Sequence, residues 1–186
     1  MGAIRSLRVF ASIAALAIVL QGCDRESPVG AVILTASGAI EKSNRGPYNP
    51  KRDLFFKYHE VSFEKAFEFD RETLLLLGIH SVTVHPPEID KPVTLQGPTL
   101  KSVLRLLGAE NAQYIRFLGL DGFATELNAE DIASKDWIVA VDAGRKPLEI
   151  GGEGPVWVVF TPANPPKATE EEQARWPWAV FYMEIK

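Results

Sequence analysis

The sequence is divided into short apolar segments, rich in β-branched residues and separated by glycine, proline and polar clusters. Several segments alternate apolar and polar side chains, and a period of two is typical of strands with one buried face. In residues 61–69, for example, Val61, Phe63, Phe67 and Phe69 share one face. The segments predicted as strands are residues 31–40, 61–69, 79–85, 114–118, 123–126, 137–141, 156–160 and 178–185.

Three short helices are predicted between these strands from their capping residues. Asp70 is placed to cap the first helix, which Gly78 ends. Gly97-Pro98-Thr99 opens the second, and Asn128 caps a single turn that forms the third. In the second helix the spacing i, i+3, i+4 puts the apolar residues on one face, and a glycine ends it. These residues are Leu100, Val103, Leu104 and Leu107, followed by Gly108.

The order of the predicted elements indicates the fold class. No long alternation of strand and helix occurs, which disfavours a doubly wound parallel sheet. We therefore expect an α+β domain of mostly β mixed sheets with short interspersed helices. Residues 41–53 and 164–175 are predicted as loops, and Asp121-Gly122 between two strands is a hairpin signature. Hydrophobic residues make up 46% of the 186, which is enough for one buried core and excludes disorder along the whole chain.

The N-terminal segment is typical of an export signal. Arg5 and Arg8 precede an apolar run at residues 9–20, which is too short to span a bilayer comfortably and fits the apolar region of a signal peptide. The run leads into Leu20-Gln21-Gly22-Cys23, which resembles the lipobox of bacterial lipoproteins, although Gln21 is atypical for its position. The alternatives are an ordinary signal peptide with an incidental cysteine, or an uncleaved anchor.

The lipobox resemblance implies that Cys23 is lipidated and becomes the mature N-terminus. Residues 1–22 would be the signal peptide, residues 23–30 a polar tether and residues 31–186 the folded domain. The implied location is the periplasm, with the membrane as a partner through the lipid anchor. Asp24 follows the cysteine, and in enterobacterial lipoproteins that residue implies retention at the inner membrane.

The charge balance disfavours polyanionic partners. The net charge of the whole chain is −4, and removal of Arg5 and Arg8 leaves 18 basic against 24 acidic residues, or −6. Nucleic acid is therefore not expected as a partner, because phosphate binding depends on clustered Lys and Arg. The basic residues considered for a cofactor phosphate are scattered along the sequence: Lys91, Lys101, Arg105, Arg116, Arg145 and Lys146.

A set of sequence blocks carries a family resemblance. They are L-T-A-S-G-A-I at 34–40, F-D-x-x-T-L at 69–74, G-P-T-L-x-x-V-L-x-x-L-G-A at 97–109, L-D-G-F at 120–123, the turn at 128–132, G-x-x-P-L at 144–148, G-P-V-x-V-V-x-x-P at 154–162 and W-x-W at 176–178. In this order they resemble the molybdopterin-binding domain shared by sulfite oxidase and its bacterial relatives. Each block is weak alone and has a structural explanation as a turn, helix end or core position.

This resemblance implies a sulfite oxidase molybdopterin-binding-domain-like fold and makes molybdopterin a possible cofactor. In enzymes of that family a cysteine thiolate holds the molybdenum, after the strand that precedes the G-x-P-L helix. That strand corresponds here to residues 79–86, which contain no cysteine, and the chain's single cysteine is Cys23. No other side chain replaces a soft anionic sulfur. We therefore transfer no metal ligand and expect no cofactor.

The candidate pocket residues are His85, Trp176 and Trp178. His85 lies near the end of the equivalent strand, where a histidine can bind a metal or contact a phosphate. A lone histidine at a strand end is more often a surface or partly buried polar residue, and His80 and His59 are weaker candidates. The two tryptophans can line an aromatic pocket, although core packing is the commoner role.

Three functions remain open from the sequence. The first is a membrane-tethered, non-catalytic periplasmic module that binds a small ligand or a membrane protein partner. The alternative is a molybdopterin-dependent oxidoreductase with atypical metal ligation, and the third is a structural envelope protein without a ligand. The sequence contains no phosphate loop, nucleophile elbow or Cys/His zinc spacing that would select another chemistry.

Overall fold

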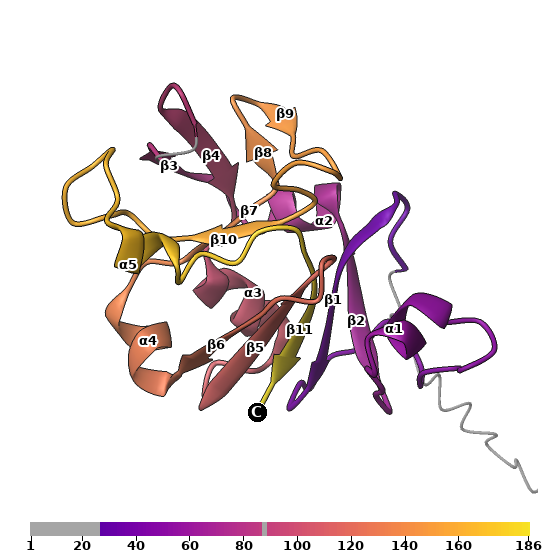
Figure 1. The fold of residues 1–186 in the computed structure, drawn as a ribbon. Coiled ribbons are helices and arrows are strands. Elements are labelled where there is room, and N and C mark those ends of the chain that lie inside the picture. The colour runs from indigo at the N-terminus through magenta and orange to yellow at the C-terminus, as the bar shows by residue number, and fades with distance from the viewer. Residues whose placement is uncertain (1–26, 87–88) are drawn as a thin grey trace, which may run out of the picture.

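The computed structural model describes residues 27–86 and 89–186, which form an α+β domain of mostly strands with short helices, as predicted (Figure 1). The predicted leader, Cys23 and Asp24 lie outside the described residues. Within the described part of the chain, the helices are α1 (Leu54–Tyr58), α2 (Arg71–Leu76), α3 (Leu100–Leu107), α4 (Ala129–Ser134) and α5 (Glu170–Gln173). The strands are β1 (Val32–Gly38), β2 (Ala66–Asp70), β3 (His80–Val84), β4 (Val93–Gly97), β5 (Tyr114–Gly119), β6 (Ala124–Asn128), β7 (Ile138–Ala140), β8 (Asp142–Ala143), β9 (Lys146–Pro147), β10 (Trp157–Val159) and β11 (Val180–Ile185).

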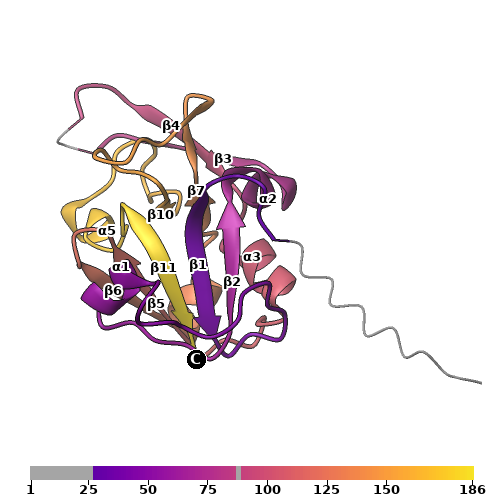
Figure 2. The ribbon, with the colours of Figure 1, turned by 90° about the vertical axis from the view of Figure 1, so that its right-hand side faces the viewer.

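The largest sheet has five strands in the order β2-β1-β11-β5-β6. Figure 2 shows β1 between β2 and β11, strands that are far apart in the sequence. The pair β1–β11 is parallel, with Thr35 opposite Tyr182, whereas the other neighbours are antiparallel. A buried hydrogen bond of 2.5 Å joins the hydroxyls of Ser37 and Tyr182 across this central pair. The two ends of the domain therefore meet in the middle of its largest sheet.

Two smaller sheets lie beyond one end of this sheet (Figure 1). Strands β3, β4, β8 and β9 form one, and β7 pairs with β10 in the other. They are joined closely, because the backbone of Val139 in β7 donates to Pro98 O and that of Val141 donates to Gln96 O. The end of β4 and the start of β7 are thus held side by side.

Both faces of the five-stranded sheet are covered, since its buried side chains alternate between two apolar clusters. In β11, Met183 belongs to the larger cluster and Tyr182 to the smaller. The larger cluster includes the buried face of α3, and Phe56 of α1 packs against the smaller one. Helices α1 and α3 therefore lie on opposite sides of the sheet (Figure 1).

The predicted caps are confirmed. The Asp70 side chain accepts from Thr73 N at the start of α2, and Gly78 follows that helix with φ +112°. Thr99 caps α3, which ends at Gly108 in the left-handed conformation that glycine adopts without strain. Asn128 caps α4 through a capping box. Helices α2 and α3 are short because their sequences specify both ends.

Some predicted boundaries are wrong. Residues 61–69 do not form one strand, because only Ala66–Asp70 pairs with β1, and β1 itself ends opposite Ala66. Val61 and Phe63 are buried in the smaller apolar cluster and do not share a face with Phe69, which belongs to the larger one. Their backbones bond to Phe56 of α1 and to Tyr48 in the loop before it. Strand β4 was not predicted, α1 follows the predicted loop 41–53, and α5 lies inside the predicted loop 164–175.

Asp70 gives a pH-dependent prediction. Its buried carboxylate accepts from Thr73 N at 2.8 Å and from Gly30 N at 2.7 Å. Burial alone would raise the pKa of Asp70, but these hydrogen bonds outweigh burial and hold the pKa below its ordinary value. The resulting stability is present above the pKa of the unfolded chain and is lost as the pH falls through the lower, folded pKa.

We expect Asp70→Asn to lower the free energy of unfolding by about 1–2 kcal/mol at neutral pH, since the amide presents a donor to one backbone N–H. The difference should shrink at acid pH, as the pH falls toward the lowered pKa of folded Asp70. Urea unfolding at both pH values measures it, with exposed Asp90→Asn as the control. An equal difference at both pH values would contradict the role of the charge.

No helix among the described residues is long and apolar enough to cross a membrane.

Candidate functional site

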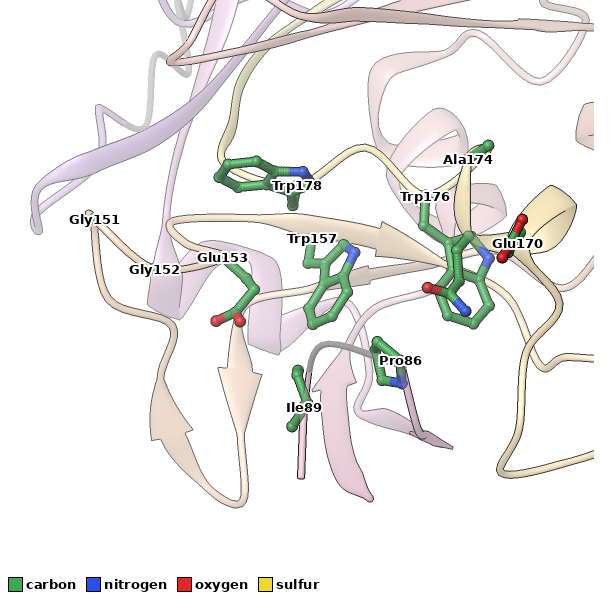
Figure 3. A pocket seen from close by; sticks show the side chains of 11 residues that line it. Pro86, Ile89, Gly151, Gly152, Glu153, Trp157, Glu170, Ala174, Trp176 and Trp178 are labelled. Atoms are coloured by element: carbon green, nitrogen blue, oxygen red, sulfur yellow. The ribbon is translucent and has the colours of Figure 1, made fainter. Parts of the chain in front are cut away.

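A partly open cavity of about 730 Å³ lies where three segments of the chain meet (Figure 3). The β3–β4 connection, the segment that leads into β10, and the segment from α5 to β11 contribute its wall. A volume of this size is within the usual range for small-molecule sites. The lining residues are Pro86, Ile89, Gly151, Gly152, Glu153, Trp157, Glu170, Gln173, Ala174, Trp176 and Trp178.

Backbone hydrogen bonds hold the tryptophan-bearing segments together. Trp157 begins β10 and lies opposite Ala140 of β7. The backbone N–H of Val158 donates to Pro177 O at 2.9 Å, and that of Ala179 donates to Glu153 O at 2.9 Å. These bonds fix residues 176–178 alongside β10. Three of the chain's four tryptophans therefore line one cavity.

The short helix α5 closes one side of the cavity. Its N-terminus is fixed by a capping box between Thr169 and Glu172. The Glu172 carboxylate accepts from the backbone N–H groups of Thr169 and Ala163, which lower its pKa. This places Glu170 and Gln173 at the cavity, and Gln173 donates to Ala168 O at 3.1 Å.

The indole N–H groups differ between the cavity and the core. Trp157 and Trp176 are only 6% and 3% exposed, and their buried Nε1 atoms meet no acceptor among the described protein residues. The fully buried Trp137, outside the cavity, donates from Nε1 to Asp131 O at 2.8 Å. Trp178 is 47% exposed. Buried donors without a partner cost free energy, so the two cavity indoles stand out from the satisfied one.

The charged groups of the cavity are all acidic. Glu153 is half-buried and Glu170 is exposed, and no lysine or arginine is among the described lining residues. Neither carboxylate makes a hydrogen bond or ion pair within the described part of the chain. The two buried aspartates elsewhere in the described residues do have partners: Asp142 forms an ion pair with Arg71 at 2.6 Å, and Asp70 accepts from backbone N–H groups.

The structure brings some of the predicted site residues together and separates others. Trp176 and Trp178 both line the cavity. His85 is half-buried beside it and donates its backbone N–H to Pro166 O, while the next residue, Pro86, is part of the wall. His80 is exposed on β3, and His59 packs against Phe55 and Phe181 in the aromatic group near α1.

No cluster of three or more His, Cys, Asp or Glu that could hold a metal occurs in residues 27–86 and 89–186. Trp157, Glu153 and Pro86 were not predicted as site residues. For Glu153 and Trp157 the sequence signal is the Gly-rich turn at 151–154, which precedes a strand that contains a tryptophan.

The cavity does not fit molybdopterin. That cofactor carries a phosphate, which proteins bind through cationic side chains, and the cavity presents carboxylates instead. The scattered basic residues do not line it: Lys101 and Arg105 lie on α3, Arg116 on β5, and Arg145 and Lys146 at the β8–β9 turn. Lys91 lies on the β3–β4 connection, two residues after Ile89, but is exposed and is not a lining residue. The strand end at His85 supplies a proline rather than a thiolate to the wall.

Comparison with known proteins identifies the fold. No protein-family model matches the sequence, and no curated protein sequence is detectably similar to it. Among solved structures, the sulfane dehydrogenase SoxCD from Paracoccus pantotrophus is similar, with a TM-score of 0.54 and 15% sequence identity. The match covers 83% of this chain but only 38% of that protein. At such low identity the likeness shows fold and not activity. The chain therefore has the predicted sulfite-oxidase-like α+β fold, which it shares with part of that sulfane dehydrogenase.

Proposed function

We propose that this chain is a membrane-tethered periplasmic binding module that holds a small ligand in the tryptophan-lined cavity and does not act as a molybdenum oxidoreductase. The observation that carries the proposal is the cavity itself. Three indole side chains line it, and two of these, Trp157 and Trp176, have buried N–H groups without a protein acceptor. Apolar, aromatic walls with a few polar groups are typical of small-molecule sites.

The unsatisfied donors favour a ligand over a purely structural role. A buried N–H without an acceptor costs about 1–3 kcal/mol, and a core position usually avoids that cost by pairing, as Trp137 does. A small adjustment of the Trp157 and Trp176 rings toward the cavity would let an oxygen of its occupant accept their hydrogen bonds. Ligand binding would therefore recover free energy that the protein alone leaves unused.

The tether is proposed from the sequence. The apolar run at residues 9–20 ends in a lipobox-like Leu20-Gln21-Gly22-Cys23, and Asp24 favours the inner membrane. Acyl chains on Cys23 would hold the domain at the membrane surface, facing the periplasm. A membrane protein that receives the ligand signal is a partner consistent with that location.

The oxidoreductase alternative is favoured by the fold likeness alone. Molybdenum and pterin analysis of protein purified from molybdate-replete cells separates the two functions. We expect neither group at significant stoichiometry. Stoichiometric molybdenum with pterin would establish the alternative and overturn the binding-module proposal.

Ligand binding itself is tested by the four indole ¹H–¹⁵N signals, assigned with single Trp→Phe variants. The probes are neutral, cationic and anionic fragments of similar size, added to the purified protein. We expect at least one fragment class to shift the signals of Trp157, Trp176 and Trp178 in a saturable way. The Trp137 signal should stay fixed, because that indole lies outside the cavity and is hydrogen-bonded.

Trp137 is thus an internal control for general effects of the fragments. If no fragment of any charge shifts the three cavity signals, the cavity is not a ligand site and the proposal fails. A shift of Trp137 as large as that of the other three would also contradict it.

A further inference from the structure

We propose that the cavity takes a small organic cation, specifically a quaternary or fully alkylated ammonium group. This inference rests on the proposed function, since it names the class of ligand for the same site. Three observations support it: the sign of the charges at the wall, the indole side chains, and the placement of the acceptors that a primary ammonium would need.

The charges come first. Glu153 and Glu170 reach the cavity from two different segments (Figure 3). Neither carboxylate forms an ion pair within the described residues. Glu153 is half-buried, and a partly desolvated carboxylate without a partner is unfavourable. A cationic ligand would supply the missing partner, whereas an anion would be repelled. Charge complementarity therefore selects a cation.

The tryptophans come second. Indole is the best of the aromatic side chains for attracting a cation to its ring face, and aromatic cages recognise quaternary ammonium groups. Figure 3 shows Trp157 between the Glu153 side chain and Trp176, with Pro86 and Ile89 on the side of the β3–β4 connection. Indole and aliphatic side chains together suit the methyl groups that surround an alkylated nitrogen.

The acceptors come third. A primary ammonium has three N–H donors, each of which needs an acceptor when it leaves water. The side-chain acceptors of the cavity are the Glu153 and Glu170 carboxylates, on different segments, and the Gln173 amide oxygen, whose NH2 group donates to Ala168 O. A quaternary nitrogen has no N–H to satisfy. The indole donors of Trp157 and Trp176 favour, in addition, an oxygen elsewhere on the ligand.

Choline and its neutral isostere 3,3-dimethylbutan-1-ol test this inference, because they share shape and hydroxyl group and differ only in the charged nitrogen. Both are titrated into the purified protein while the four indole signals are recorded. We expect choline to bind at least about tenfold more tightly than the alcohol, and added salt to weaken choline binding alone.

The Glu153→Gln variant should weaken choline binding about five- to tenfold and leave the alcohol unchanged. Glu149→Gln is the matched control, since Glu149 is an exposed carboxylate four residues away that does not line the cavity. Glu170→Gln provides a second cavity variant should Glu153→Gln disturb the free protein's indole spectrum. A loss of choline binding in the Glu149 variant equal to that in the Glu153 variant would overturn the inference.

The outcomes separate this inference from the proposed function. Equal affinity for choline and the alcohol, or saturable binding of neutral or anionic fragments alone, would overturn the cation inference while the cavity remains a ligand site. If no compound of any charge shifts the cavity signals, both fail together. Charge-selective binding of choline that depends on Glu153 would support both.

Discussion

Replacing Gly97 by alanine is expected to lower the free energy of unfolding by about 3–5 kcal/mol, a large part of the total stability of a domain this size. Gly97 is the last residue of β4, where β4 meets β7. An added Cβ would lie 2.0 Å from Val139 O, 2.8 Å from Val139 C and 2.9 Å from Ala140 Cα. All three atoms belong to the backbone, so a change of side-chain rotamer cannot relieve the clash. The strands would have to separate, and β7 carries β10 and the cavity wall with it.

Urea unfolding followed by tryptophan fluorescence measures this loss. Gly46→Ala is the matched control, because an added Cβ there meets no atom within 4 Å and the residue has no positive φ. That variant should change the free energy of unfolding by less than about 1 kcal/mol, with stabilisation possible through the unfolded chain. Equal midpoints for the two variants would show that β4 and β7 are not as closely packed as described.

The second large effect concerns location. The Cys23→Ser variant should move from the membrane to the soluble periplasmic fraction, because serine cannot form the thioether that carries the acyl chains. Each buried methylene adds about 0.8 kcal/mol to membrane binding, so two or three chains hold a protein far more firmly than one. Cell fractionation and the mass of the mature N-terminus measure the change.

Asp24→Ser is the control for this experiment, since it keeps the thiol and should leave the protein membrane-bound. It also tests whether Asp24 determines the membrane to which the protein is sorted, because this variant can change only the distribution between the inner and outer membranes. A Cys23→Ser protein that stays with the membranes as fully as the parent would contradict the lipid anchor.

Local structure was predictable where the sequence specifies both ends of an element. Helix α3 has a Thr99 cap, an apolar stripe and Gly108, and its predicted and observed bounds agree. The hairpin between β5 and β6 follows from Asp121-Gly122. Strand β4 and helix α1 were missed because each is short and lies among loop-forming residues, so pairing and packing with distant segments decide their structure.

The site was less predictable than the fold. Trp176 and Trp178 were identified as aromatic candidates, but which residues meet them depends on long-range pairing. Residues 156–160 are all buried, so no alternation distinguishes Trp157 as a wall residue. Glu153 comes near Trp178 because the Ala179 N–H bonds to its carbonyl, a contact between segments that no local pattern reveals. His85 was predicted as a pocket residue because it lies at the end of its strand. In the structure the next residue, Pro86, lines the cavity and His85 does not.

The position of β11 has a consequence for the order in which the molecule can fold. While that strand is still inside the ribosome, β2–β1 and β5–β6 can form only as separate two-stranded pairs, because β11 is what joins them. Pairs of this kind are marginally stable in water, and contacts between strands so distant along the chain form slowly. The five-stranded sheet can therefore be completed only after β11 has emerged.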